Sequence, residues 1–276
     1  MSARLRTRAS VLTVLATAGA LAMAVGCATP PPSGEPLSDG ALAEIADALT
    51  RQSAPLEAIR SSGTGVAKFD GRRVEFAFAA LYDAPGWARA DVRPEAGSLS
   101  STMTALLLWD DECGRCYLPA RAVEISGCAD GAEGRYGGLD RAALLLGVPD
   151  GDLVNALQDA RIARRGDGFT IEGTVGGSAV TIVAEGSPPR LRGLSLVEDR
   201  TELRLEYEGH GWKPFAWFPK TTEVTVLRGG RVALSARLEF RAARLSSHVD
   251  RGSFVFDVPS DTQLVDWNDL DLWRKE

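Results

Sequence analysis

Hydrophobic and polar residues alternate with a period of two over most of the chain from Gly63 onward, which is the pattern of β-strands that bury one face. The clearest example is segment 201–208, where Leu203, Leu205 and Tyr207 share one face and charged residues share the other. We count about ten or eleven such segments at regular spacing, which is typical of an antiparallel, mainly β fold.

Tight turns separate several of these segments. The dipeptides Asp70-Gly71, Gly176-Gly177 and Gly229-Gly230 each stand between two alternating runs, and glycine suits the two-residue turns of β-hairpins. Besides segment 201–208, these alternating segments are 66–69, 74–78, 86–93, 103–110, 116–126, 169–174, 178–185, 190–198, 223–227 and 232–240. A short last strand containing Phe254 and Phe256 follows them.

Helical periodicity occurs only near the start and in the middle of the chain. In residues 38–53, capped by Ser38 or Asp39, three apolar residues fall on one face at helical spacing: Leu42, Ile45 and Leu49. Two shorter helices are predicted at 139–146 and 152–158. Because these helices are too few for alternating β-α-β units, we predict an incomplete antiparallel β-barrel whose concave face the helices cover.

The first 26 residues differ from the rest. Three arginines precede an apolar run of about 15 residues, and no acidic residue occurs before Glu35. This order is typical of a secretory signal peptide, because the run is short of the roughly 20 residues that span a bilayer. Its end, Ala24-Val25-Gly26-Cys27, resembles the bacterial lipobox, which implies cleavage after Gly26 and lipidation of Cys27. The alternative is an ordinary signal peptide that happens to contain a cysteine.

The expected organisation has four parts. They are the signal peptide (1–26), the lipidated cysteine with a proline-rich tether (27–37), the half-barrel domain (38–260) and an amphipathic tail (261–276). Apolar residues recur every three positions in the tail, so we expect it to dock on the barrel or to bind a partner. They are Leu264, Trp267, Leu270 and Trp273.

Removing residues 1–26 from the 276-residue chain leaves 250 residues and lowers the formal net charge from −6 to −9, because three arginines are lost. Such an acidic domain is unsuited to nucleic acid. No later apolar run is long enough to span a membrane, so the lipid is the only membrane anchor that we expect.

Three cysteines remain after Cys27, namely Cys113, Cys116 and Cys128. Acidic residues flank the Cys113–Cys116 pair in a predicted turn, and they would raise a thiol pKa, which argues against redox chemistry. In an oxidising compartment we expect one disulfide, with Cys113–Cys116 and Cys116–Cys128 as possible pairings. A zinc site formed by the three thiols would need a distant histidine, so we expect no metal. We expect no cofactor beyond the covalent lipid.

Catalytic motifs are lacking in the sequence. His210 and His248 stand alone, and there is no nucleophile elbow or phosphate-binding glycine loop. We therefore do not expect an enzyme.

The order of elements resembles the bacterial lipoprotein-sorting superfamily of the periplasmic carrier LolA and the outer-membrane receptor LolB. The resemblance rests on the first helix and on four segments: 61–65 (SSGTG), 76–92 (FAFAALYDAPGWARADV), 144–149 (LLLGVP) and 207–226 (YEG…WFPKTTEVTV). It implies a half-open barrel that accepts acyl chains, in a lipoprotein-sorting or outer-membrane lipid-handling role. Lipoproteins or a periplasmic carrier are the implied partners.

The resemblance also indicates which residues to examine. The candidates for contact with acyl chains or the core are Leu42, Ile45, Leu49, Phe76, Phe78, Leu203, Leu205, Leu234 and Leu238. Leu99 corresponds to an apolar residue on a protruding loop of the receptor, and Ala28 after Cys27 implies the outer membrane, facing the periplasm. The alternative function is a lipid-anchored structural or protein-interaction module whose own side chains fill the barrel.

Overall fold

The structure is a computed structural model. It describes residues 35–36, 38–53, 58–69, 71–83, 87–95, 105–109, 113–119, 122–128, 144–147, 151–198, 200–211, 216–246 and 249–266. Its helices are α3 (Asp39–Ser53), α5 (Gly151–Asn155) and the 3₁₀ helix η2 (Arg251–Phe254). Its strands are β1 (Glu35–Pro36), β2 (Ala58–Phe69), β3 (Arg72–Asp83), β4 (Trp87–Pro94), β5 (Ala105–Trp109), β6 (Cys113–Leu118), β7 (Val123–Cys128), β8 (Gln158–Arg165), β9 (Gly168–Val175), β10 (Ser178–Glu185), β11 (Arg190–Glu198), β12 (Thr201–Glu208), β13 (Thr221–Arg228), β14 (Arg231–Ser246) and β15 (Gln263–Asp266).

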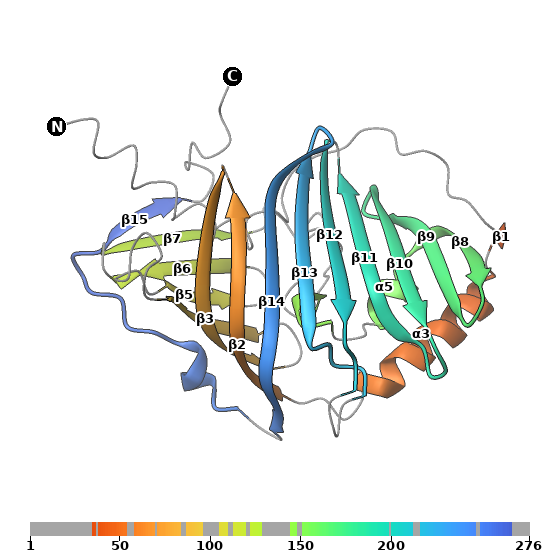
Figure 1. Cartoon of the computed structure of the whole chain (residues 1–276), viewed down its shortest axis with the longest axis horizontal. Helices are drawn as coiled ribbons and strands as arrows, with labels where there is room; N and C mark the ends of the chain where they lie inside the picture. Colours follow the sequence, from red (N-terminus) through yellow and green to blue (C-terminus); the bar gives the residue numbers. More distant parts are fainter. Residues whose placement is uncertain are drawn as a thin grey trace.

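These fifteen strands form one sheet in the described part of the chain, ordered β1-β8-β9-β10-β11-β12-β13-β14-β2-β3-β4-β5-β6-β7-β15 (Figure 1). Neighbouring strands are antiparallel, except that β15 runs parallel to β7. Two meanders, β2–β7 and β8–β14, meet where β14 pairs with β2. The mainly β, antiparallel fold is confirmed, and the sheet is not closed into a barrel. It has more strands than the ten or eleven predicted.

The extra strands come from segments whose sequence pattern is weak. Strand β8 was not predicted, because Ile162 is its only large apolar residue. The segment predicted as one strand, 116–126, is instead the hairpin of β6 and β7, in which the N–H of Ala122 donates to the carbonyl of Pro119 at 3.2 Å. The C-terminal segment around Leu264 forms strand β15 (Gln263–Asp266).

The register aligns the apolar faces of the strands into one inner face. A single row of directly opposed residues crosses nine strands, and all but its alanine on β14 are buried: Ile162, Ile171, Ile182, Leu194, Leu205, Val224, Ala236, Ala67 and Val74. Because a shift of one residue would turn an apolar face toward solvent, this pattern specifies the pairing. The predicted turns at Gly176-Gly177 and Gly229-Gly230 are confirmed, with φ between 53° and 85°.

Helix α3 begins where the sequence predicts it. The hydroxyl of Ser38 accepts a hydrogen bond from the N–H of Ala41 at 3.3 Å, as an N-cap does. The apolar side of α3 packs in one core cluster with α5 and the inner face of β8–β13, and Figure 1 shows α3 along this half of the sheet. The core cluster of the other half contains no residue of α3 or α5, so the described helices do not cover the whole concave face.

The chain after β14 crosses the outer face of β4–β6, and we call residues 249–258 the strap. Phe254 packs against Trp87 with ring centroids 5.9 Å apart, and Phe256 stacks on Tyr117 at 5.8 Å. These rings belong to a third core cluster, on the opposite side of the sheet from the other two. The predicted last strand at Phe254 and Phe256 is therefore wrong, because its alternation reflects packing on a sheet and not pairing within one.

Two further observations concern the membrane and the tail. No helix among the described residues is both long and apolar enough to cross a bilayer. Strand β15 extends the sheet beyond β7, where Val265 packs against the inner core cluster and Leu264 remains 71% exposed. Trp267 and the rest of the tail lie outside the described residues, as do the signal peptide and most of the tether.

Candidate functional site

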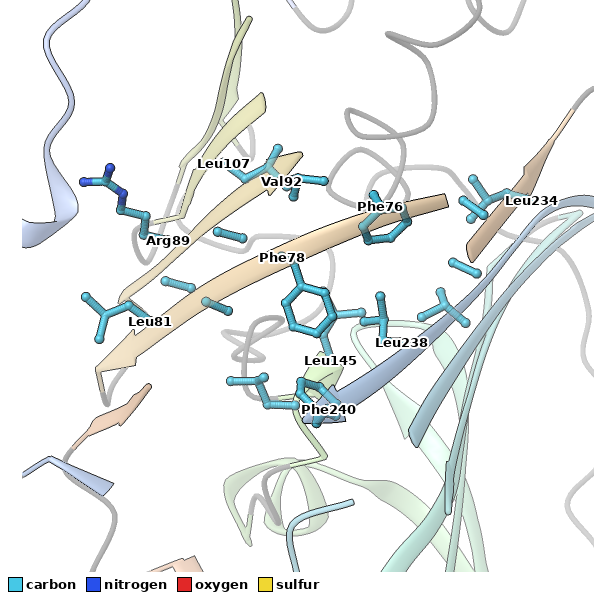
Figure 2. A pocket seen from close by; sticks show the side chains of 17 residues that line it. Phe76, Phe78, Leu81, Arg89, Val92, Leu107, Leu145, Leu234, Leu238 and Phe240 are labelled. Atoms are coloured by element: carbon cyan, nitrogen blue, oxygen red, sulfur yellow. The ribbon is translucent and has the colours of Figure 1, made fainter. Parts of the chain in front are cut away.

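An apolar cavity of about 150 Å³ lies on the inner face, where the two meanders meet (Figure 2). Strands β2–β5, β13 and β14 and the turn at residues 144–147 bound it. Among the described residues that line it, sixteen of seventeen are apolar, and the remaining one is Arg89. The lining residues are Ala67, Phe76, Phe78, Ala80, Leu81, Ala88, Arg89, Ala90, Val92, Leu107, Leu145, Leu146, Val224, Leu234, Ala236, Leu238 and Phe240.

Two glycines on β2 explain how large rings can lie flat against this part of the sheet. Gly63 and Gly65 are directly opposite Phe78 and Phe76 on β3. A Cβ atom added to Gly65 would lie 2.4 Å from the ring of Phe76, and one added to Gly63 would lie 2.9 Å from the ring of Phe78. The two phenylalanine rings therefore occupy the space that side chains on β2 would fill.

Pairs of alanines on both sides of these rings leave space above the sheet. Ala67 is paired with Ala236, and Ala80 is paired with Ala90, so small side chains face each other across adjacent strands. Packed interiors leave few voids when large residues fill such positions. The cavity thus follows from small residues at inner-face positions of four neighbouring strands.

The described lining of the cavity contributes no free charge. Arg89 is one of the lining residues, but its guanidinium lies on the strap side of β4, where it donates to Asp91 at 3.0 Å and to the strap carbonyls of Ser253 and Val255 at 3.0 and 3.2 Å. Figure 2 shows this guanidinium pointing away from the rings of Phe76 and Phe78. Water would find few hydrogen-bonding partners in such a space, so an apolar guest suits it better.

A buried hydrogen bond holds the turn that closes one side of the cavity. The hydroxyl of Tyr207 donates to the carbonyl of Leu144 at 2.6 Å, and both residues are buried. Desolvation raises the pKa of Tyr207, so this hydroxyl stays protonated and remains a donor. The bond positions Leu145 and Leu146 on the cavity wall.

The structure divides the predicted contact residues between two places. Phe76, Phe78, Leu234 and Leu238 line the cavity. Leu42, Leu49 and Leu205 are buried in the core cluster under α3, with Ile45 and Leu203 partly buried beside it. Cys27 and Leu99 lie outside the described residues. The predicted contact residues did not include the small lining residues or Phe240, although alanines at alternating positions next to glycines were a usable signal.

The cysteines differ from both pairings considered from the sequence. Cys116 is a free thiol, buried in the inner core cluster, and desolvation raises its pKa to about 12. Both pairings use Cys116 and are therefore wrong. Cys113 begins strand β6 and lies directly opposite Cys128 in the register with β7. No group of three or more potential metal-ligating side chains occurs among the described residues.

His210 follows strand β12 and has no catalytic surroundings that the structure describes. Desolvation is the largest cause that lowers its pKa, followed by the positive charges of Arg192 and Arg190, and the resulting pKa is about 4. Its Nε2 atom is buried without a hydrogen-bond partner. The imidazole is therefore neutral at neutral pH. His248 lies outside the described residues.

Comparison with solved structures defines the fold. A LolA superfamily protein from Nitrosomonas europaea matches 80% of this chain and 98% of its own, with a TM-score of 0.52 and 11% identity. A putative outer membrane lipoprotein-sorting protein domain from Vibrio parahaemolyticus matches 77% and 97%, with a TM-score of 0.50 and 10% identity. The chain has a LolA-like fold.

A DUF1329 family protein from Desulfovibrio piger shares this LolA-like fold, covering 78% of this chain and 97% of its own with a TM-score of 0.54 and 12% identity. No protein-family model matches the sequence, and no curated protein matches it. At these identities the comparison concerns the fold, and function has to be argued from the cavity.

Proposed function

We propose that this chain is a non-catalytic envelope lipoprotein that binds acyl chains of lipids or lipoproteins in its half-open sheet. The observation that carries the proposal is the cavity, whose described lining residues are apolar except for one arginine engaged elsewhere. The LolA-like fold supports it, because one solved neighbour is described as a putative outer membrane lipoprotein-sorting protein.

The cavity is small compared with a typical ligand pocket. A volume of about 150 Å³ is roughly ten times the minimum that holds one water, but it is below the ~300–1,000 Å³ of typical ligand pockets. A long acyl chain therefore needs neighbouring side chains to move aside. Each methylene that it buries contributes about 0.8 kcal/mol, which can offset that movement.

The proposal includes the membrane anchor. The lipobox-like sequence at Cys27 and the tether before Glu35 support attachment to the outer membrane, with the domain facing the periplasm and receiving its guest from a lipoprotein or a periplasmic carrier. Replacing Cys27 with Ser is expected to abolish partition into membranes. Firm membrane binding of a processed Cys27→Ser protein would contradict the lipid anchor.

An envelope location also bears on the thiols. We predict a Cys113–Cys128 disulfide, because the two residues are directly opposed on β6 and β7 while Cys116 is free. Thiol titration of the denatured chain lacking Cys27 should therefore find one free thiol before reduction and three after it. Three free thiols before reduction would contradict the pairing.

The deciding experiment combines native mass spectrometry with uptake of a fluorescent acyl probe, on residues 28–276 produced in a periplasm. We expect co-purified lipid or saturable probe binding. Replacing Ala80 with Leu, which fills part of the cavity, should weaken binding. Replacing the exposed Ala79, its neighbour on the other face of β3, should not.

The alternative function, a structural or interaction module with a self-filled sheet, makes the opposite prediction. It is supported if the protein has a clean apo mass and takes up no probe. It is also supported if the Ala79→Leu and Ala80→Leu variants behave alike, because the cavity would then play no part in binding.

A further inference from the structure

Two hydroxyl groups on the inner face of the described sheet have no hydrogen-bond partner, that of Ser61 on β2 and that of Thr222 on β13, and Ser61 is the one that lies among small side chains. Ser61 lies on β2, its side chain is 6% exposed, and its Oγ atom makes no hydrogen bond within the described structure. It shares the inner face with Ile59 and Ala67, which belong to the inner core cluster. Leaving a buried hydroxyl unpaired is unfavourable, so its presence here calls for a polar group to meet it.

The register places Ser61 beside one end of the cavity. Ser61 is directly opposite Ala80 on β3, and Ala80 is opposite Ala90 on β4; both alanines line the cavity. Directly opposed Cβ atoms of antiparallel strands are about 4.5–5.5 Å apart. Figure 2 shows Leu81 and Arg89, the chain neighbours of these two alanines, at the opposite end from Leu234.

Ser61 is not itself a lining residue, but it places a polar group beside Ala80, next to one end of the apolar cavity. Small residues surround Ser61 at this end, since Gly63 follows it on the same face of β2 and Ala243 faces it from β14. Phe76 and Leu234 line the other end. An amphiphilic guest fits this arrangement in one direction, with its head group next to Ser61.

The head group that fits carries no charge. The only charged residue among the described lining residues, Arg89, is already engaged by Asp91 and by two strap carbonyls, so it is not available to neutralise a carboxylate. Burying an unpaired carboxylate costs far more than burying a neutral carbonyl. A hydroxyl donor instead matches the carbonyl oxygen of an ester or an amide.

We infer that the cavity is selective for uncharged acyl esters or amides, whose carbonyl oxygen accepts a hydrogen bond from Ser61 Oγ while the chain extends toward Phe76 and Leu234. This inference rests on the proposed acyl-binding function and adds the chemical class and the orientation of the guest.

The test compares two guests with the same palmitoyl chain, monopalmitoylglycerol and palmitic acid, in competition with a fluorescent acyl probe at a pH where the acid is ionised. The wild-type mature chain should prefer the ester. Ser61→Ala should weaken ester binding roughly three- to tenfold and acid binding little, as expected for one neutral hydrogen bond. Ser62→Ala, on the other face of the same strand, should change neither affinity.

The stability of the unliganded protein provides a second readout. Removing a hydroxyl that has no partner should leave the melting temperature of Ser61→Ala unchanged or raise it. A lowered melting temperature would mean that Ser61 has a structural partner and would overturn the inference, as would equal affinities for ester and acid in the wild type. If neither guest binds the wild type, the proposed function itself fails.

Discussion

The close approach of β2 to β14 can be tested with a single methyl group at Gly63. A Cβ atom at this position would lie 2.0 Å from the backbone carbonyl oxygen of Glu239, whereas real Cβ contacts essentially never fall below 3.0 Å. Backbone cannot rotate aside as a side chain does, so the strands must separate. They would do so next to the place where β14 already shifts its register, between Phe240 and Ala242.

The cost can be bounded from this geometry. Overpacking of an interior by one or two methylene groups typically costs about 1–3 kcal/mol, and each kcal/mol lowers the melting temperature of a domain of this size by about 2–4 °C. We therefore expect Gly63→Ala to melt about 2–12 °C below the wild type in circular dichroism. The effect should persist without any guest, because it arises in the backbone.

Two matched glycines separate this explanation from a general effect of alanine. In Gly65→Ala the nearest atoms belong to the ring of Phe76, which can turn, so stability should fall less while binding of an acyl probe changes. In Gly40→Ala nothing lies within 4 Å, and on helix α3 the change should leave stability equal or raise it by up to about 1 kcal/mol. A Gly63→Ala protein as stable as the wild type would refute the reasoning.

Three further predictions concern single side chains. Tyr207→Phe leaves the buried carbonyl of Leu144 without its donor, so thermal unfolding should show a loss of about 1–3 kcal/mol. The pKa of His210 is lowered in the folded state, so protonation favours the unfolded state. The free energy of unfolding should therefore be unaffected by His210 above pH 6.5 and fall as the pH drops toward about 4, and urea unfolding of His210→Gln should lack this fall. The pKa of the Cys116 thiol rises from 9.0 to about 12, so alkylation at pH 9 should modify this residue only in the unfolded protein.

The alternating pattern was sufficient to predict most strands, because it reflects the burial of one face of each strand. Where one face of a strand is wet and the other dry, as in β12, a period of two predicts both the strand and its inward side chains. Glycine pairs located the hairpins for an equally local reason. Strand β8 escaped notice because it is largely polar, and its pairing with β9 is not visible in its own residues.

Contacts between segments that are distant in the sequence could not be predicted from the alternation of hydrophobic and polar residues. The strap satisfies the alternation of a strand, yet Phe254 and Phe256 pack on the outer face of β4 and β6, about 140–165 residues earlier in the chain. Nothing local distinguishes an extended segment that pairs from one that only packs. The same reason explains why strand β15 was missed, since its partner β7 lies far upstream.

The position of the cavity depends on differences in side-chain size between residues on neighbouring strands. A pattern of hydrophobic and polar positions does not record side-chain size. Where a phenylalanine lies over a glycine, as Phe78 lies over Gly63, no space is left on the inner face, because the ring fills the volume that a side chain on the glycine would occupy. Where alanine is paired with alanine, the small side chains leave space above the sheet. The two alanine pairs are on either side of the phenylalanine rings, and Figure 2 shows Phe78 near the middle of the lining side chains. A guest longer than the cavity must therefore displace this ring, which packs edge-on against Phe240 at 5.5 Å. Truncating Phe78 would join the two spaces above the alanine pairs into one groove.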